Sequence, residues 1–228
     1  MDSTRKTAIV IGVLFLIAIG TYNLGIFLID TVLDDPDYLL NVTKNENRVI
    51  TGSLLIIVDC AAVVALAVLL YPILKKFNRP IALGYVGFRI VECTTLIVAV
   101  ICTLLLIPLS QEFIKAGAPD DSYFQTLGTL LQEVHYWTYR IVILIFSSIF
   151  GTLLAYLLYR SKLVPRYISF LGLVGYPLWL PAALLDIFGH SEGMILGIPG
   201  GIFEIIFPIW LIVHGFNSSA LDPGIDNK

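Results

Sequence analysis

The dominant pattern along this chain is a series of long apolar blocks separated by short polar segments. A helix rises about 1.5 Å per residue, so about 20 apolar residues cross the ~30 Å hydrocarbon core of a membrane. Within a block the apolar residues do not alternate with polar ones, as they would in a membrane barrel. The sequence therefore predicts an all-α, polytopic membrane helix bundle with six transmembrane helices. The predicted helices are Ala8–Ile29, Val49–Leu74, Ile81–Leu109, Trp137–Tyr159, Tyr167–Ile187 and Met194–Gly215.

Composition agrees with this interpretation. The chain has 228 residues, of which 57% are hydrophobic and 14% charged, whereas a soluble domain has about 25% charged residues. A single core of this size could not hide so many apolar side chains. No linker or low-complexity tract divides the sequence, so we expect one six-helix domain over residues 1–228. Arg5 and Lys6 would also suit a signal peptide, but no small-residue cleavage site follows the long first block.

The loops suggest an orientation, because cytoplasmic loops of membrane proteins carry an excess of Lys and Arg. Nine basic residues fall on the side of the N-terminus and three on the opposite side. We therefore expect a multi-pass protein of the cell membrane with both termini cytoplasmic. The lipid bilayer is its expected partner, and nucleic acid is not, because no basic stripe is present. The sequence does not decide the oligomeric state. The nine residues are Arg5, Lys6, Lys75, Lys76, Arg79, Arg160, Lys162, Arg166 and Lys228, and the three are Lys44, Arg48 and Lys115.

Capping signals add two features on the side opposite the termini. Asp35 followed by Pro36 predicts a short interfacial helix that ends near Lys44. Ser122 with Gln125 three residues later reads as a capping box. A helix from there to Tyr159 would be about 57 Å long. We therefore expect the fourth helix to project beyond the hydrocarbon core.

Helix breakers and small residues mark the last three spans. Pro177 and Pro181 predict a kink in the fifth helix. The segment Gly197–Gly201, which includes Pro199, predicts a delayed start of the sixth. Ser147 and Gly151 form a small-residue pair that favours close contact with a neighbouring helix.

The most informative residues are the ionisable ones inside the predicted spans. A central charge costs about 2.5–3.5 kcal/mol even on the mildest insertion scale, so each must find a counter-charge, reach water or become neutral. Counting residues from the ends of their blocks puts three acids about 15 Å deep, near the middle of the membrane. Arg89 precedes Glu92 by three residues, so both lie on one helix face. The residues are Asp59, Arg89, Glu92 and Glu204, with His135 and Arg140 nearer the outer boundary.

These positions predict a polar cluster of Asp59, Arg89, Glu92 and Glu204 at mid-depth. One arginine cannot neutralise three carboxylates. Burial and repulsion between like charges both favour the protonated form of a carboxyl group, so we expect one or two of the acids to hold a proton or a cation. The cluster is therefore a candidate site for a proton, a cation or a small polar ligand, and it favours a small binding or transport protein. The alternative is a structural role in which the charges only fix the helix register.

Enzyme motifs are scarce, and the sequence favours a protein that is not an enzyme. There is no His-x-x-x-His or Cys-x-x-Cys pair for a metal, no Gly-x-Ser-x-Gly elbow and no phosphate-binding glycine loop. No cofactor can be assigned. The alternative, an intramembrane enzyme acting on lipid, would use Asp186 and His190 together with His135 and Glu133 near the outer surface.

Several segments together resemble a known family. They are Phe-Arg-Ile-Val-Glu over residues 88–92, Tyr-Arg-Ser-Lys-Leu-Val-Pro-Arg over 159–166 and Gly-Ile-Phe-Glu over 201–204. Over nearly its whole length the chain is similar to the bacterial and archaeal membrane family catalogued as domain of unknown function 4386. The resemblance implies six helices, no assigned activity, and family positions at Asp59, Arg89, Glu92, His135 and Glu204. Tyr136 stands where the family often has an acid.

Overall fold

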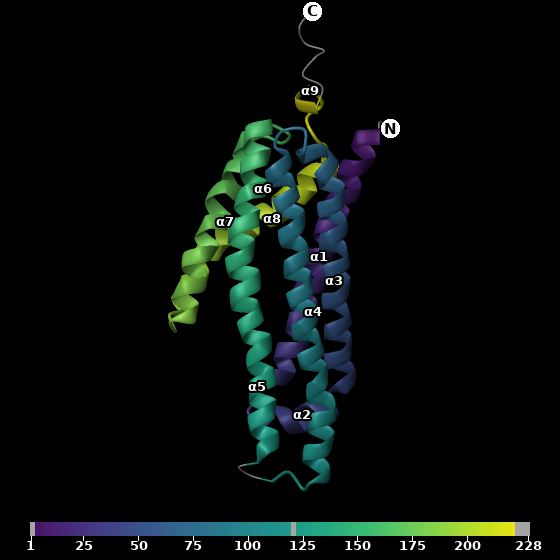
Figure 1. The fold of residues 1–228 in the computed structure, drawn as a ribbon, viewed down its shortest axis with the longest axis vertical. Coiled ribbons are helices and arrows are strands. Elements are labelled where there is room, and N and C mark those ends of the chain that lie inside the picture. Colours follow the sequence, from purple (N-terminus) through teal and green to yellow (C-terminus); the bar gives the residue numbers. More distant parts are fainter. Residues whose placement is uncertain (1–2, 120–121, 222–228) are drawn as a thin grey trace, which may run out of the picture. The chain divides into compact units, whose positions relative to one another are not determined.

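A computed structural model describes residues 3–119 and 122–221 of the chain. All regular secondary structure in these residues is helical, and six helical segments are long and apolar enough to cross a membrane. The predicted all-α fold with six spanning helices is confirmed. The segments are α1 (Ser3–Leu33), α3 (Glu46–Leu74), α4 (Arg79–Lys115), a run of α5 (Tyr123–Thr138), a π-helical segment (Tyr139–Phe146) and α6 (Ser147–Ser161), then α7 (Arg166–Ile187), and α8 (Ile198–Val213) with the 3-10 helix Ser191–Gly197 before it (Figure 1).

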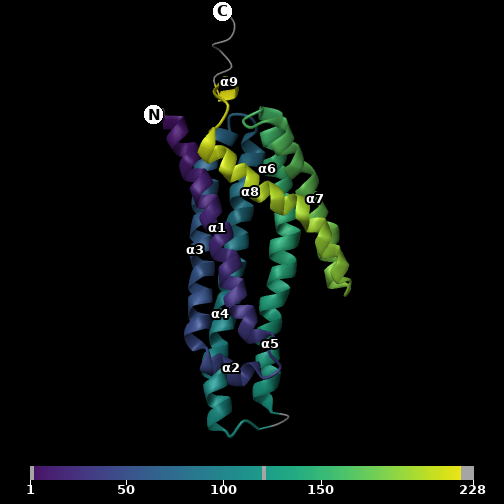
Figure 2. The same cartoon turned by 180° about the vertical axis from the view of Figure 1, so that it is seen from behind.

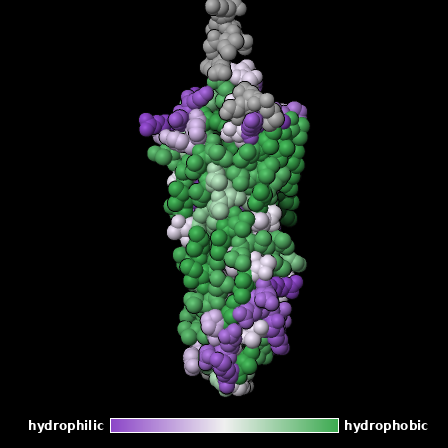
Figure 3. Space-filling view, turned by 90° about the vertical axis from the view of Figure 1, so that its right-hand side faces the viewer, coloured by the Kyte–Doolittle hydropathy of each residue, from purple (hydrophilic) through white to green (hydrophobic). Residues whose placement is uncertain are grey.

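The surface has the character expected of a membrane protein. Large apolar side chains such as Leu54, Leu83 and Phe170 are more than half exposed. On the face drawn in Figure 3, apolar residues cover most of the helical surface. Soluble proteins rarely expose apolar surface on this scale, whereas lipid chains solvate it without cost. The protein is therefore an integral, multi-pass membrane protein. Its orientation stays a prediction.

The short helix predicted before Lys44 is present as α2 (Tyr38–Lys44), but it begins two residues later than expected. Asp37 takes the N-cap position, and the Asp35 carboxylate accepts a hydrogen bond from the Asp37 backbone N–H at 2.8 Å. Asp35 therefore shapes the turn before the helix and does not cap it. The difference follows from the local geometry of aspartate, which readily bonds the backbone two residues on.

The long fourth span is continuous, as predicted, and α5 starts directly after Ser122. The Ser122 hydroxyl is buried without a hydrogen-bond partner, so the predicted side-chain capping box does not form. The π-helical segment Tyr139–Phe146 was not predicted. Such segments are rare and often lie at functional sites. The spacing of apolar residues in the sequence does not indicate a π-helix there.

Breaker residues act on the last two helices in different ways. The helix α7 continues through Pro177 and Pro181, so the kink expected there stays a prediction. By contrast, α8 starts only at Ile198, after a 3-10 helix, with Pro199 in its first turn. The predicted delay of the sixth helix is confirmed. Proline suits this position because the first N–H groups of a helix have no partner within it.

The chain forms two compact units. The first holds the described residues within 1–17, 62–92 and 140–228, and the second holds those within 18–61 and 93–139. The helices α1, α3 and α4 each contribute one part to each unit. The expectation of a single domain over residues 1–228 stays a prediction.

In the first unit, α7 packs against both α6 and α8 through glycines. Gly151 of α6 faces the ring of Tyr176, which confirms the close helix contact predicted at Gly151; Ser147 is buried. Gly175 of α7 lies against the backbone of Pro199 and Gly200. Small residues let helix backbones approach closely, which is how helices associate in lipid, where hydrophobic burial drives little.

The start of α1 is held to the far end of α8 in the same unit (Figure 2). Arg5 donates hydrogen bonds to the carbonyls of Leu211, Ile212 and Val213 at 2.8, 2.6 and 2.8 Å. These carbonyls belong to the last turn of α8, where carbonyl groups are not fully bonded within the helix; the Leu211 carbonyl also accepts from the Gly215 backbone N–H at 3.1 Å. A cation also suits the negative end of the helix dipole. Arg5 therefore caps α8 from a segment about 200 residues away in the chain.

The second unit has its own core under α2. Leu39, Phe113 and Phe124 are buried together, so α2 packs on the end of α4 and the start of α5. Ser110 of α4 donates a hydrogen bond to the Leu39 carbonyl and shares another, at 2.6 Å, with the Thr43 hydroxyl. The first turns of α5 are therefore packed against other helices. Their height above the membrane stays a prediction.

The contact between α7 and α8 generates a prediction. In Gly175→Ala, the new methyl group would lie within 3 Å of the Gly200 and Pro199 backbone, which cannot rotate away as a side chain can. We expect the free energy of unfolding to fall by about 1–3 kcal/mol, as for other overpacked cores. Thermal unfolding in detergent measures this.

Gly84→Ala is the matched control, because nothing lies within 4 Å of a methyl group built there. It should leave stability unchanged or raise it slightly, since alanine favours a helix over glycine. Equal behaviour of the two variants would contradict the close α7–α8 contact.

Candidate functional site

An ion pair inside the first unit forms the centre of the candidate site. Arg89 and Glu92 lie one turn apart on α4, and the Arg89 Nη1 atom is 2.7 Å from Glu92 Oε2. Both side chains are buried, with exposed fractions of 6% for Arg89 and 4% for Glu92. The spacing of three residues places them on one helix face, as the sequence predicted. A pair removed from water in this way is stable only if its remaining polar atoms also find partners.

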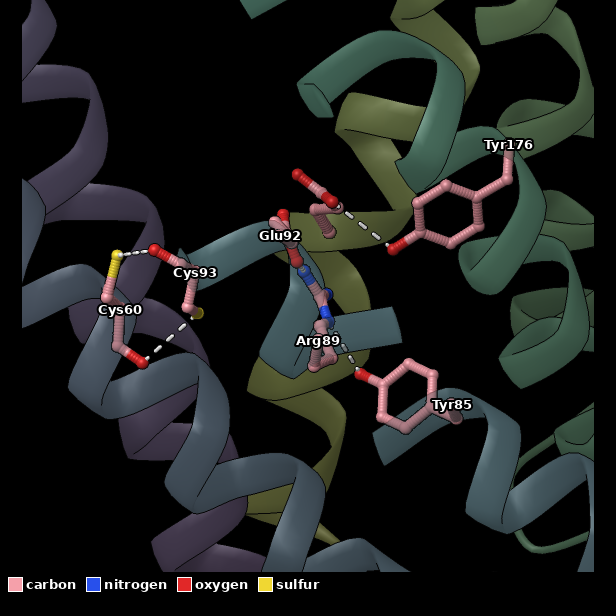
Figure 4. Close-up of polar contacts among 7 residues, drawn as sticks. Cys60, Tyr85, Arg89, Glu92, Cys93 and Tyr176 are labelled. Carbon is pink, nitrogen blue, oxygen red and sulfur yellow. Dashed lines mark hydrogen bonds and ion pairs between the residues drawn. The ribbon is translucent and has the colours of Figure 1, made fainter. Parts of the chain in front are cut away.

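The rest of the guanidinium contacts two aromatic residues, Tyr85 and Phe150, of which Figure 4 draws Tyr85. The Arg89 Nε–H donates a hydrogen bond to the hydroxyl of Tyr85, one turn earlier on α4, at 3.3 Å. The Arg89 Cζ atom lies 4.3 Å from the centre of the Phe150 ring of α6. Tyr85 and Phe150 are fully buried. A cation over an aromatic face is stabilised by the ring quadrupole, so Arg89 joins α4 to α6.

A second carboxyl reaches this centre from α8. Tyr176 of α7 donates a hydrogen bond from its hydroxyl to Glu204 Oε1 at 3.2 Å. Glu204 interacts electrostatically with both Arg89 and Glu92. It is half-buried, in contrast to the buried ion pair. The structure therefore brings together three of the four residues predicted for the cluster.

The charges of Arg89, Glu92 and Glu204 determine what this site can bind. Arg89 balances one carboxylate, and Glu92 is the one that it contacts directly. Glu204 is a further carboxyl with a tyrosine hydroxyl as its neighbour. In an apolar medium such a carboxyl is stable when it is protonated or when it lies beside a bound cation.

Asp59, the fourth predicted member of the cluster, belongs to the second unit, where it is buried. Its place beside Arg89 stays a prediction. The next residue, Cys60, makes a reciprocal contact with α4 in the same unit (Figure 4). The Cys60 thiol lies 3.8 Å from the Cys93 carbonyl, and the Cys93 thiol lies 3.4 Å from the Cys60 carbonyl.

His135 is buried in the second unit and pairs with an acid that sequence reasoning missed. Its Nε2 atom lies 2.9 Å from Asp30 Oδ1 at the end of α1. Glu133, which the lipid-enzyme alternative grouped with His135, is exposed. Residues two apart on a helix do not face each other, so His135 and Glu133 point in different directions from α5. Tyr136, the next residue, donates a hydrogen bond from its hydroxyl to the carboxylate of Asp34, one turn beyond Asp30.

Arg140 also has a carboxylate partner, in the first unit. Its Nε atom donates to Asp186 Oδ2 of α7 at 2.8 Å, and both side chains are half-buried. Asp186 is therefore engaged by an arginine, whereas the lipid-enzyme alternative required it beside histidines. His190 of the same group is exposed. Among the residues that the structure describes, no group of three or more His, Cys, Asp or Glu side chains is placed to hold a metal ion.

Comparison with known proteins gives the family. The model of the family described as "Domain of unknown function (DUF4386)" matches residues 10–215. The chain belongs to this family. The resemblance seen in the sequence is thereby confirmed. Neither a comparison with curated proteins nor one with solved structures finds a match.

In this DUF4386 protein, sequence reasoning missed three aromatic residues of the site. Tyr85 could have been found, because it precedes Arg89 by four residues on the same face of α4. Phe150 and Tyr176 gave no signal. They lie on other helices, and only the packing of α6 and α7 brings them to Arg89 and Glu204.

The site generates a prediction about the DUF4386 fold. Arg89→Met keeps a long side chain but leaves the buried Glu92 without its cation. We expect a loss of about 3–5 kcal/mol in the free energy of unfolding, as for other broken buried pairs. The double variant Arg89→Met/Glu92→Leu should recover most of it, because no uncompensated charge remains. Unfolding in detergent measures both.

A second ion pair on α4 supplies the control. Glu112 and Lys115 have the same spacing and a 2.8 Å contact, but their side chains are 61% and 70% exposed. Lys115→Met should change stability far less, since exposed pairs contribute little. Equal losses of stability in Arg89→Met and Lys115→Met would contradict the claim that burial makes the Arg89–Glu92 pair important for stability.

Proposed function

We propose that this protein binds a proton or a small cation within the membrane and carries it across, with Glu204 as the group that takes it up and releases it. The observation that supports the proposal most is the charge count of the site. Two carboxyl groups, Glu92 and Glu204, interact with one guanidinium, Arg89.

The free-energy cost of a buried charge explains why this charge count favours binding of a positive ion. The Arg89–Glu92 pair is close to neutral as a whole. An ionised Glu204 would leave one uncompensated charge, which costs about 2.5–3.5 kcal/mol near the middle of a membrane. A proton on Glu204, or a cation beside it, removes this charge. The site is therefore more stable when occupied, which is the property of a binding site for a positive ion.

Glu92 and Glu204 differ in solvent exposure, and this difference suggests different roles for the two carboxyl groups. Glu92 is only 4% exposed and is held directly by Arg89. Glu204 is half-buried, and its carboxyl accepts a 3.2 Å hydrogen bond from Tyr176. An exchangeable group needs a path for the ion, whereas a permanent partner does not. We therefore assign exchange to Glu204 and a fixed counter-charge to Glu92.

Tyr176 suits both states of such a carboxyl. A tyrosine hydroxyl can donate to an ionised carboxylate and can accept from a protonated one. Its ring is fixed, because it packs edge-on against Trp179 and Phe203 at 5.4 and 5.5 Å between ring centres. The hydroxyl can therefore stay beside Glu204 while the carboxyl gains or loses its proton.

A structural role is the competing function, and the packing of Arg89 favours it. The guanidinium touches Phe150 of α6 and Tyr85 of α4, so the ion pair also fixes how these helices meet. If this were its whole role, the charges would matter for stability and not for ion movement. The two functions differ in what Glu204→Gln does, because this change keeps the shape of the side chain and removes its ionisation.

The test is ion flux in liposomes that contain the purified protein and a pH-sensitive dye. Under an imposed pH gradient or membrane potential, wild-type vesicles should move protons, or cations added outside, faster than empty vesicles. Glu204→Gln should reduce the flux to the level of empty vesicles, because the exchangeable carboxyl is gone.

Glu112→Gln is the control, since it makes the same chemical change at an exposed glutamate. It should leave the flux at the wild-type level. A flux that never exceeds that of empty vesicles, or one that survives in folded Glu204→Gln protein, would reject transport and leave the structural role.

A further inference from the structure

A pocket lies where three membrane-spanning segments of the first unit end. Its volume is about 410 Å³. One wall is the turn 162–165 between α6 and α7, with Arg166 at the start of α7. The other wall is the end of α8, from Trp210 to Asn217. The spanning segments end at Ser161 and Val213 and begin at Arg166. The pocket therefore lies beside the ends of three candidate membrane spans, where the boundary between membrane and water is expected.

The polar side of the pocket is basic. Lys162, Arg166 and His214 line it, and all three are exposed. None of the described residues that line the pocket is acidic. The Arg166 guanidinium lies over the Tyr159 ring, with 5.5 Å from its Cζ atom to the ring centre. Lysine and arginine side chains gathered without an acid attract an anion, and guanidinium geometry matches phosphate.

The other side of the pocket is apolar. Trp210, Phe216 and Pro165 contribute to it, and the Trp210 ring stacks on the His214 ring with 4.0 Å between centres. Tryptophan is enriched at the level of lipid headgroups. A ligand that fills this pocket would combine a negative group with apolar surface.

The floor of the pocket is fixed by hydrogen bonds. The Asn217 backbone N–H donates to the Leu163 carbonyl at 2.9 Å, and the Asn217 side chain donates to the Lys162 carbonyl at 3.4 Å. Lys162 itself has a left-handed backbone, with φ of 56°. These bonds hold the segment after α8 against the α6–α7 turn. The basic groups therefore face the pocket from a preformed frame.

We propose that this pocket binds a phosphate group, and that the apolar wall makes an anionic phospholipid its preferred source. Basic pockets between membrane helices bind lipid headgroups through the same combination of charge and interfacial position. This proposal does not depend on ion transport at Glu204, because no residue is shared between the two sites.

The experiment uses the full chain in a neutral detergent. The thermal unfolding midpoint is measured against added phosphatidylglycerol, phosphatidylcholine or inorganic phosphate. Phosphatidylglycerol should stabilise the protein more than phosphatidylcholine. Stabilisation by inorganic phosphate as well would show that the phosphate group suffices, and its absence would show that the lipid is required. Either result with inorganic phosphate is compatible with a phosphate-binding pocket, and the variants below decide whether binding occurs there.

The variant Lys162→Asn/Arg166→Gln removes two basic groups, and asparagine tolerates the left-handed backbone at residue 162. Its apparent affinity for phosphatidylglycerol should fall roughly 30-fold, given the usual contribution of a basic residue near an anionic surface. Lys75→Gln/Lys76→Gln removes the same charge from the α3–α4 turn and should retain the wild-type affinity.

Equal losses in the two double variants, or equal stabilisation by both lipids, would overturn the proposal. The single variant Arg166→Gln serves if the double variant does not fold. It should weaken binding in the same direction, and an unchanged affinity would overturn the proposal too.

Discussion

The guanidinium of Arg89 imposes the strictest requirement on this structure, because it is always charged and α4 carries it into a buried, apolar environment. Its position is tolerable only if each side of it finds a partner. Glu92 supplies the counter-charge, Tyr85 accepts a hydrogen bond, and Phe150 covers the cation with its ring. These contacts fix the rotation of α4 and its contact with α6. Glu204 then shares this one guanidinium with Glu92.

The helices around this centre associate through close backbone contact. The glycines at 151 and 175 bring α6 and α8 onto α7, and Arg5 closes the end of α8. In lipid, apolar side chains gain little by leaving lipid for protein, so small residues and polar contacts decide which helices meet. The same contacts bring Tyr176 to Glu204. The packing and the site are therefore products of one arrangement of α7.

Much of the fold could be predicted from the sequence, because long apolar blocks have a single stable form in a membrane. The delayed start of α8 and the one-turn spacing of Arg89 and Glu92 also followed from local rules. Partners from distant segments could not be predicted in this way. Asp30 for His135 and Asp186 for Arg140 depend on which helices lie side by side, and no local spacing rule links residues about 105 and 46 positions apart.

The limits of local reasoning are clearest at two further features. The capping box at Ser122 had the right residues, yet its hydroxyl has no partner in the structure. The π-helical segment Tyr139–Phe146 has no signature in the order of apolar residues. Both are decided by the surroundings of the helix, where packing outweighs small local preferences.

The central claim is that Glu204 exchanges a proton while Glu92 stays ionised beside Arg89. Infrared difference spectroscopy of the purified protein during a pH change measures this directly, because a protonated carboxyl has its own C=O stretching band. The account predicts such a band in the wild type, its loss in Glu204→Gln and its persistence in Glu112→Gln. A band that persists in Glu204→Gln, or no protonated carboxyl band in the wild type at any pH at which the protein is folded, would contradict it.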